Sequence, residues 1–204
     1  MSGWVSVLNY LNGDHVNQSA LIQGGAGGLG RALVDRILES GRFDRVFVTA
    51  RDASRILSED PRVVPIALDL TDDASIAEAA ETIRALTDHL HLAITTAGLL
   101  QDDATGVKPE KKLGDLTRSH LQRVFSVNCF GPFLWYAALG RLIRHREPII
   151  IATLSARVAS IGDNRLGGWH SYRASKTAQN MLTKNLSLEL GRTNPKAIVV
   201  GLHP

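Results

Sequence analysis

Tyr172 and Lys176 are the two residues whose types and spacing point most directly to proton transfer. Side chains four positions apart on a helix share one face, with Cβ atoms about 5–6 Å from each other. A tyrosine has a pKa of about 10, and an ammonium ~4 Å away at an effective dielectric of ~20 favours the phenolate by roughly 4 kcal/mol. We therefore expect a tyrosine pKa of about 7, the range in which a general acid or base works at neutral pH.

A glycine-rich turn, residues 23–30 with the sequence QGGAGGLG, precedes this pair by about 140 residues. It stands between an apolar run and a helical pattern, which is the context that a dinucleotide-binding turn requires. Glycines let backbone N–H groups approach a pyrophosphate, and the amino end of the helix adds a partial positive charge. A plain turn is the alternative interpretation. The glycines form two overlapping registers: Gly25, Gly27 and Gly30, or Gly24, Gly28 and Gly30.

Arg51 follows the predicted second strand. Dinucleotide sites often place an acidic residue about 20 residues past the turn, where it holds a ribose hydroxyl. A guanidinium at this point instead suits the 2′-phosphate of NADP(H) through a bidentate contact. Asp52 comes next and could still reach a ribose, so NADP(H) is favoured and NAD(H) is the alternative. A surface role is the plain interpretation of Arg51.

Short apolar runs alternate with helical patterns along the chain. Strands are predicted over residues 19–24, 45–50, 63–68, 92–96, 148–154 and 197–202, and helices over 29–40, 73–87, 119–146 and 169–190. Several strands are apolar throughout, which is typical of a parallel sheet covered on both faces. Helix caps are expected at Asp72 or Asp73 and at Thr117 or Ser119. The order of elements predicts an α/β fold with a doubly wound parallel sheet.

Composition narrows the function classes. The 204 residues suffice for one domain over residues 19–204, after a leader of uncertain structure over residues 1–18. The formal charge of +3 is dispersed, which argues against a nucleic-acid partner. No membrane span or signal peptide is evident, and a single cysteine, Cys129, fits a cytoplasmic location. His89 and His91 lack metal-ligand neighbours, so no metal site is expected.

Six motifs in a fixed order give the chain a family resemblance. They are the glycine turn, Asp69-Leu70, Ala97-Gly98, Asn128, Ser155 and Tyr172 with Lys176. Over residues 19–204 the chain resembles the short-chain dehydrogenase/reductase family, in particular the branch similar to the bacterial cell–cell signalling C-factor. The resemblance implies a Rossmann-type sheet with strand order 3-2-1-4-5-6. Family members continue past a sixth strand, so the substrate-covering segment and the seventh strand are expected to be missing after Pro204.

The resemblance also implies which residues bind the cofactor. The family's turn selects the second glycine register, so Gly24, Gly28 and Gly30 would bind the cofactor together with Leu29. Asp69 would contact the adenine amino group and Leu70 would pack beside the ring, although an acid here could equally cap the next helix. Ala97 and Gly98 would let the backbone pass the adenine ribose. The family's Asn-Asn-Ala-Gly is Thr-Thr-Ala-Gly at residues 95–98, which puts the side-chain hydrogen bonds that support the central sheet in doubt.

The catalytic set implied by the resemblance is Asn128, Ser155, Tyr172 and Lys176. Asn128 would distort its own helix and position a water toward the lysine, and Ser155 would hold a substrate carbonyl. Ser160 is a rival because it is closer to Tyr172, but Ser155 ends an apolar strand. Tyr172 would transfer the proton, and Lys176 would also bind the nicotinamide ribose.

Together these features predict an NADP(H)-preferring oxidoreductase that interconverts a carbonyl and an alcohol of a small-molecule substrate by hydride transfer. The alternative is a dinucleotide-binding signalling or regulatory protein with little turnover. The resemblance further implies a homodimer or homotetramer that pairs through the two long helices.

Overall fold

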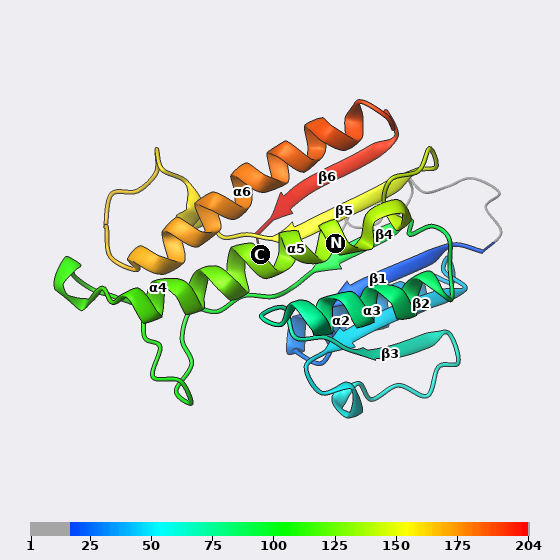
Figure 1. The fold of residues 1–204 in the computed structure, drawn as a ribbon, viewed down its shortest axis with the longest axis horizontal. Coiled ribbons are helices and arrows are strands. Elements are labelled where there is room, and N and C mark those ends of the chain that lie inside the picture. The colour runs from blue at the N-terminus through cyan, green and yellow to red at the C-terminus, as the bar shows by residue number, and fades with distance from the viewer. Residues whose placement is uncertain (1–16, 204) are drawn as a thin grey trace.

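The computed structural model describes residues 17–203, and its centre is a parallel sheet of six strands in the order β3-β2-β1-β4-β5-β6 (Figure 1). The strands are β1 (Ser19–Gln23), β2 (Arg45–Ala50), β3 (Val63–Ala67), β4 (Leu92–Thr95), β5 (Ile149–Leu154) and β6 (Ala197–Leu202). The predicted fold class and strand order are confirmed. Of the predicted leader, residues 1–16 lie outside the described part of the chain.

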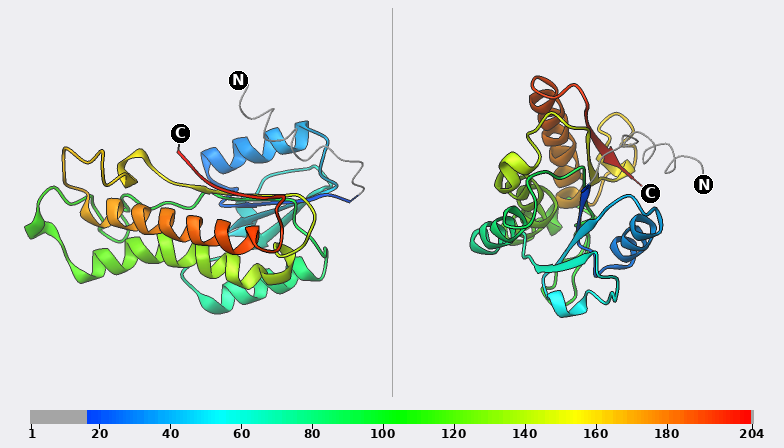
Figure 2. Two further views of the ribbon diagram at one scale, coloured as in Figure 1. Left: turned by 90° about the horizontal axis from the view of Figure 1, so that it is seen from above. Right: turned by 90° about the vertical axis from the view of Figure 1, so that its right-hand side faces the viewer.

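Two hydrophobic cores flank the sheet because successive side chains of each strand point to opposite faces. Ala20 and Ile22 of β1 pack in one core, and Leu21 between them packs in the other. The helices are α2 (Gly28–Glu39), α3 (Asp73–Arg84), α4 (Arg118–Phe125), α5 (Gly131–Leu139) and α6 (His170–Gly191). Figure 2 shows α2 on one face and α3, α5 and α6 on the other. Strands covered on both faces explain the uninterrupted apolar runs.

The single helix predicted over residues 119–146 is wrong. Between α4 and α5 the chain forms a π-helical segment, η3 (Ser126–Phe130), and α5 stops at Leu139, where Gly140 takes a φ of +50°. Pro132 has no N–H to give to the carbonyl four residues back, so the α-helical ladder cannot continue through this point. Gly131 packs on Leu70, whose carbonyl oxygen would lie 2.4 Å from an added Cβ.

The helix ends settle the two predicted caps. Asp72 caps α3 by accepting hydrogen bonds from the Ala74 and Ser75 amides, and Thr117 caps α4 by accepting from the His120 amide. The helix predicted over residues 73–87 is shorter than expected and ends at Arg84. Within residues 17–203, no helix is both long and apolar enough to cross a membrane.

Candidate active site

The glycine turn joins β1 to α2, and each glycine there has a different physical reason. Gly24 has a φ of +87°, which favours glycine, and a Cβ on Gly30 would lie 2.2 Å from the Gly24 carbonyl oxygen. Gly25 is also required, since a Cβ would lie 2.1 Å from Cγ1 of Val48. Close packing between strand, turn and helix therefore uses glycines from both predicted registers.

Gly27 and Gly28 differ from these packed glycines because both are exposed. A Cβ on Gly28 would meet no atom of the described chain within 4 Å, and Gly27 caps α2 without any side-chain hydrogen bond. The first amides of α2 are thus open to a ligand, and the partial positive charge of the helix end favours an anion there. This surface fits the pyrophosphate of a dinucleotide.

Arg51 and Asp69 lie at the ends of β2 and β3, on the same edge of the sheet as the turn. Burial acts to raise the pKa of Asp69, but hydrogen bonds from Thr71 and the charges of Arg123 and Arg51 outweigh it, so this pKa lies below its usual range. Asp69 accepts hydrogen bonds from the amide and hydroxyl of Thr71. It does not cap α3, so the alternative role that the sequence left open for it is wrong. Leu70 is buried in the core that α3 and α5 share.

The residues that replace the family's asparagines still hydrogen-bond β1 to β4. Thr96 donates its hydroxyl proton to the carbonyl of Gln23 at 2.8 Å, and the side-chain oxygen of Gln23 accepts from the Ala97 amide at 3.2 Å. Thr95, which replaces the other asparagine, accepts a hydrogen bond from the Tyr136 hydroxyl at 2.8 Å, and this hydroxyl also lies 3.0 Å from the Thr153 hydroxyl. The support that the sequence put in doubt is therefore present, with different donors.

Asn128 lies in the π-helical segment, and its side chain is completely buried. The side-chain oxygen accepts from the Leu99 amide at 2.6 Å, and the side-chain nitrogen donates to the Leu99 carbonyl and to the Ser175 hydroxyl, both at 3.0 Å. The predicted distortion of the helix at Asn128 is confirmed. The amide fixes the segment after β4 against α6, one residue before Lys176.

Ser155 follows β5 and donates its hydroxyl proton to the side-chain oxygen of Asn180 at 2.6 Å. Asn180 is a candidate site residue that the sequence analysis missed. Its signal was the spacing, because Tyr172, Lys176 and Asn180 repeat every four positions along one face of α6. Ser160 contacts a different region, where it accepts from the Asp163 amide.

The expected coupling between Lys176 and Tyr172 is not found in this structure. Lys176 is 2% exposed, and its ammonium donates to the carbonyls of Leu154 at 2.7 Å and Ala97 at 3.5 Å. Burial lowers the pKa of Lys176 to about 8. Burial also raises the pKa of Tyr172 above its ordinary value, so the predicted pKa of about 7 is wrong for this arrangement. The ammonium satisfies backbone carbonyls instead of the phenol.

A buried carboxylate holds the amino end of α6, just before Tyr172. Glu110 accepts hydrogen bonds from the Ser171 amide at 3.2 Å and from the Ser171 hydroxyl, and its own carbonyl accepts from the Trp169 amide. Trp169, whose φ is +49°, packs edge-on against the Tyr172 ring. Sequence spacing gave no signal for Glu110, because it lies 61 positions before its partner.

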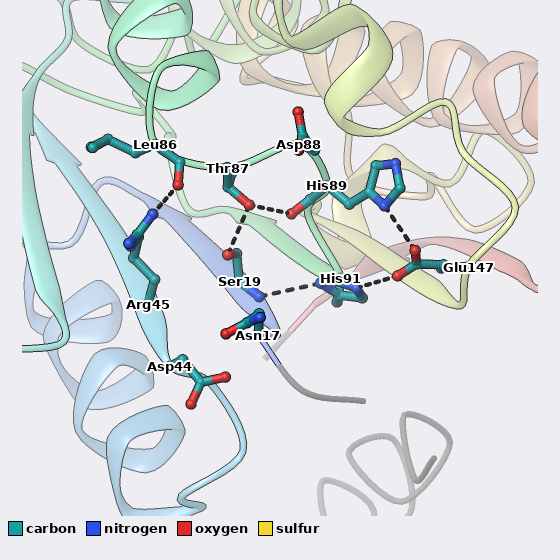
Figure 3. A pocket seen from close by; sticks show the side chains of 10 residues that line it. All are labelled: Asn17, Ser19, Asp44, Arg45, Leu86, Thr87, Asp88, His89, His91 and Glu147. Atoms are coloured by element: carbon teal, nitrogen blue, oxygen red, sulfur yellow. Dashed lines mark hydrogen bonds and ion pairs between the residues drawn. The ribbon is translucent and has the colours of Figure 1, made fainter. Parts of the chain in front are cut away.

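A surface cavity of about 480 Å³ lies at the opposite edge of the sheet (Figure 3). Glu147 there lies 2.9 Å from Nδ1 of His89 and 2.8 Å from Nε2 of His91. Nδ1 of His91 accepts from the Ser19 amide, so both ring nitrogens of His91 are engaged. Among residues 17–203, no group of histidine, cysteine or acidic side chains is arranged to hold a metal ion. This cavity lies at the other end of the strands from the catalytic candidates, and Glu147, His89 and His91 in it bond to one another.

Sequence comparison assigns the family. Residues 18–204 match the family model described as short chain dehydrogenase. The chain belongs to this family.

An uncharacterized oxidoreductase of Schizosaccharomyces pombe is 28% identical over 194 residues, which cover 92% of this chain and 73% of that protein. The 1-hydroxy-2-glutathionyl-2-methyl-3-butene dehydrogenase of a Rhodococcus species is 25% identical over 186 residues, covering 91% and 76%. The C-signal protein of Myxococcus xanthus is 33% identical over 93 residues, 45% of this chain and 54% of that protein.

Solved structures agree on the fold. The carbonyl reductase Sniffer of D. melanogaster superposes with a TM-score of 0.80 at 23% identity, covering 93% of this chain and 81% of that one. A short chain dehydrogenase from Burkholderia cenocepacia, solved in complex with NADP, has a TM-score of 0.76 at 24% identity, covering 92% and 73%. These similarities support the Rossmann-type fold.

Proposed function

We propose that this protein is an NADP(H)-preferring oxidoreductase that interconverts a carbonyl and an alcohol on a small-molecule substrate. The observation that carries the proposal is the convergence of β5 and α6 at the carboxyl edge of the sheet. Lys176 bonds the carbonyl just before Ser155, and Ser155 bonds Asn180, one helical turn past Lys176. Tyr172 lies one turn earlier on the same helix face.

The described residues fit a dinucleotide. Gly27 and Gly28 would leave room for the pyrophosphate at the amino end of α2, and Arg51 would pair with a 2′-phosphate. Gly98 passes close to Lys176, with an added Cβ 3.7 Å from Nζ, so backbone and ammonium meet where the cofactor's ribose is expected. Asp69, with its lowered pKa, would offer a carboxylate to the adenine end.

When bound, the reduced nicotinamide would supply a hydride to the carbonyl carbon of the substrate. Tyr172 donates its phenolic proton to the carbonyl oxygen, and the raised pKa of Tyr172 keeps it protonated at neutral pH for this step. Ser155 turns its hydroxyl from Asn180 toward the developing oxyanion, a contribution worth about 2.7–4 kcal/mol for one donor in comparable sites. Lys176 places a positive charge beside the site, and Asn128 holds the surrounding backbone.

A second candidate function is dinucleotide-dependent regulation with little turnover. The similarity to the C-signal protein favours it, as does the position of the Lys176 ammonium on backbone carbonyls instead of on the phenol. Both functions require the nucleotide, but only the first requires Tyr172 as a proton donor.

Two measurements separate these functions. NADPH should raise the melting temperature of the full chain in either case, because a ligand that binds the folded state stabilises it. NADPH oxidation in the presence of a panel of aldehydes and ketones should be detectable only for the enzyme. A melting shift without oxidation of NADPH by any carbonyl would support the regulatory protein.

We further propose that the chain works in the cytoplasm as a homodimer or homotetramer. The single buried cysteine suits a reducing compartment. Four large apolar side chains are exposed on the segment from η3 to α5 and on α6, and they would suit a helix-to-helix interface: Phe130, Leu134, Met181 and Leu188. Light scattering of the purified protein would test the assembly directly.

A further inference from the structure

The connection between β5 and α6 carries a second cavity of about 350 Å³ (the connection is visible in Figure 1). Three arginines line it, Arg157, Arg165 and Arg173, together with one carboxylate, Asp163. Three like charges around one small space repel each other, and a single carboxylate does not neutralise them. A cavity with this imbalance favours an anion.

Two of the three guanidiniums are held in place by backbone carbonyls. Arg173 donates from Nε to the Gly168 carbonyl at 3.1 Å and from Nη1 to the Val158 carbonyl at 3.4 Å. Arg165 donates from Nη1 to the Gly162 carbonyl at 2.8 Å. Each guanidinium has five N–H donors, so both keep donors that bond none of the described residues. Fixed guanidiniums lose less entropy when they bind a planar or tetrahedral anion.

The nearby acidic groups do not compensate this charge. Asp163 forms no ion pair with any residue in the described part of the chain, and its amide is bonded to the Ser160 hydroxyl. Glu110, which approaches the end of the same connection through Gly168, already receives the Ser171 amide and hydroxyl. The positive charge of the cavity is therefore available to a ligand.

We propose that the cavity between Arg157, Arg165 and Arg173 is a binding pocket for the carboxylate or phosphate group of a small molecule. Arg173 directly follows Tyr172, and the connection begins just after Ser155. A molecule that is anchored here has its acidic group beside the segment that carries the proton donor. That link to the reaction rests on the proposed function, whereas anion binding in the cavity does not.

The test is a titration of the ¹⁵N-labelled full chain with inorganic phosphate, and separately with succinate, at constant ionic strength. We expect saturating NMR shifts of the Gly167 and Gly168 amides and of the Arg165 side-chain N–H. The phosphate arm and the succinate arm tell a phosphate pocket from a carboxylate pocket. The measurement needs neither NADPH nor turnover, so it can succeed even if the proposed function fails.

Two sets of variants should change the anion affinity in opposite directions, which makes the titration decisive. Removing two charges with Arg157→Gln and Arg165→Gln together should weaken binding about 25-fold, at roughly fivefold for each exposed charge. Asp163→Asn should strengthen binding by about fivefold for the same reason. Arg192→Gln, which removes an exposed charge at the other end of α6, should leave the affinity unchanged. Shifts that do not saturate, shifts confined to residues 27–30, or equal affinity in the double variant would overturn the proposal.

Discussion

The two edges of the sheet both gather ionisable side chains, but they differ in how those groups are paired. At the amino edge, Glu147 bonds His89 and His91, and His91 also receives the Ser19 amide. At the carboxyl edge, the Tyr172 hydroxyl bonds none of the described residues, and the buried Lys176 is held by carbonyls without a carboxylate partner.

We interpret the paired groups of the amino edge as structural and the incompletely paired groups of the carboxyl edge as candidates for the reaction. A buried charge without a counter-ion costs stability, and such arrangements concentrate at functional sites. The amino edge has a cavity of about 480 Å³, yet Glu147, His89 and His91 in it bond to one another. We therefore base the proposed site on the incompletely paired groups of the carboxyl edge and not on the cavity at the amino edge.

The substitution Tyr172→Phe should have the largest effect, and it tests whether the unpaired tyrosine at the carboxyl edge is the proton donor. This change removes the transferable proton and keeps the ring, so we expect carbonyl reduction to fall about 10²- to 10⁴-fold with little change in stability. Tyr136→Phe is the matched control. Its hydroxyl bonds Thr95 and Thr153 inside the core, so its loss should cost about 1–3 kcal/mol of unfolding free energy and leave turnover largely intact. Equal activity of wild type and Tyr172→Phe would contradict the assignment.

Lys176→Met tests the cost of the buried charge through its pH dependence. Because the pKa of Lys176 is about 8 in the folded chain and 10.5 in a free side chain, the unfolded state binds more protons between these values. The unfolding free energy should rise by about 3 kcal/mol from pH 8 to pH 10.5, and this gain is lost again as the pH falls from 10.5 to 8, because below pH 8 both states carry the proton. Denaturant unfolding at pH 8 and pH 10 should show the rise in wild type and in the exposed-lysine control Lys184→Met. The same rise in Lys176→Met would show that the charge is not buried at a cost.

Gly28→Ala should separate ligand binding from folding at the carboxyl edge. The new methyl group meets no atom of the described chain, and alanine is favoured over glycine in a helix, so stability should be kept or rise by up to about 1 kcal/mol. The methyl group would stand where the pyrophosphate approaches, and NADPH affinity should fall about tenfold, as a loss of ~1.4 kcal/mol would give. Gly30→Ala is the contrasting variant, because its Cβ collides with the Gly24 carbonyl and should destabilise the fold. Unchanged NADPH affinity in Gly28→Ala would place the nucleotide elsewhere.

The smallest expected effect lies at the amino edge. Glu147→Ala removes the partner of His89 and His91, but Glu147 is 42% exposed, so we expect a loss of only about 1 kcal/mol in unfolding free energy. NADPH affinity and turnover should not change. A loss of turnover without a loss of stability would show that this edge takes part in function.

The sequence predicted most of the fold because its strongest signals are local. The uninterrupted apolar runs gave the strands, and Gly24 to Gly30 gave the turn before α2. The predictions failed where distant residues decide the structure. The distortion at Asn128 was predicted, but its hydrogen bonds to Leu99 and Ser175 were not, and neither was the anchor of α6 at Glu110.

In the candidate site, too, the residues could be predicted from the sequence, but the contacts that depend on distant residues could not. Tyr172 and Lys176 were predicted from residue type and spacing, and Ser155 from the family resemblance, but their hydrogen bonds were not predicted. Spacing placed the Lys176 ammonium near the phenol, whereas the fold brings it to the carbonyls of Leu154 and Ala97. The pKa of Tyr172 moves upward instead of downward because burial prevails over a charge that points elsewhere.

The most direct measurement is a crystal structure of the full-length protein grown with NADPH. The expected result is a nucleotide along the carboxyl edge, with its pyrophosphate on the first amides of α2, from Gly28 onward, and its nicotinamide beside Tyr172. A nucleotide bound in the amino-edge cavity around His89 and Glu147, or crystals that contain none at saturating NADPH, would contradict the claim that the incompletely paired edge is the reactive one.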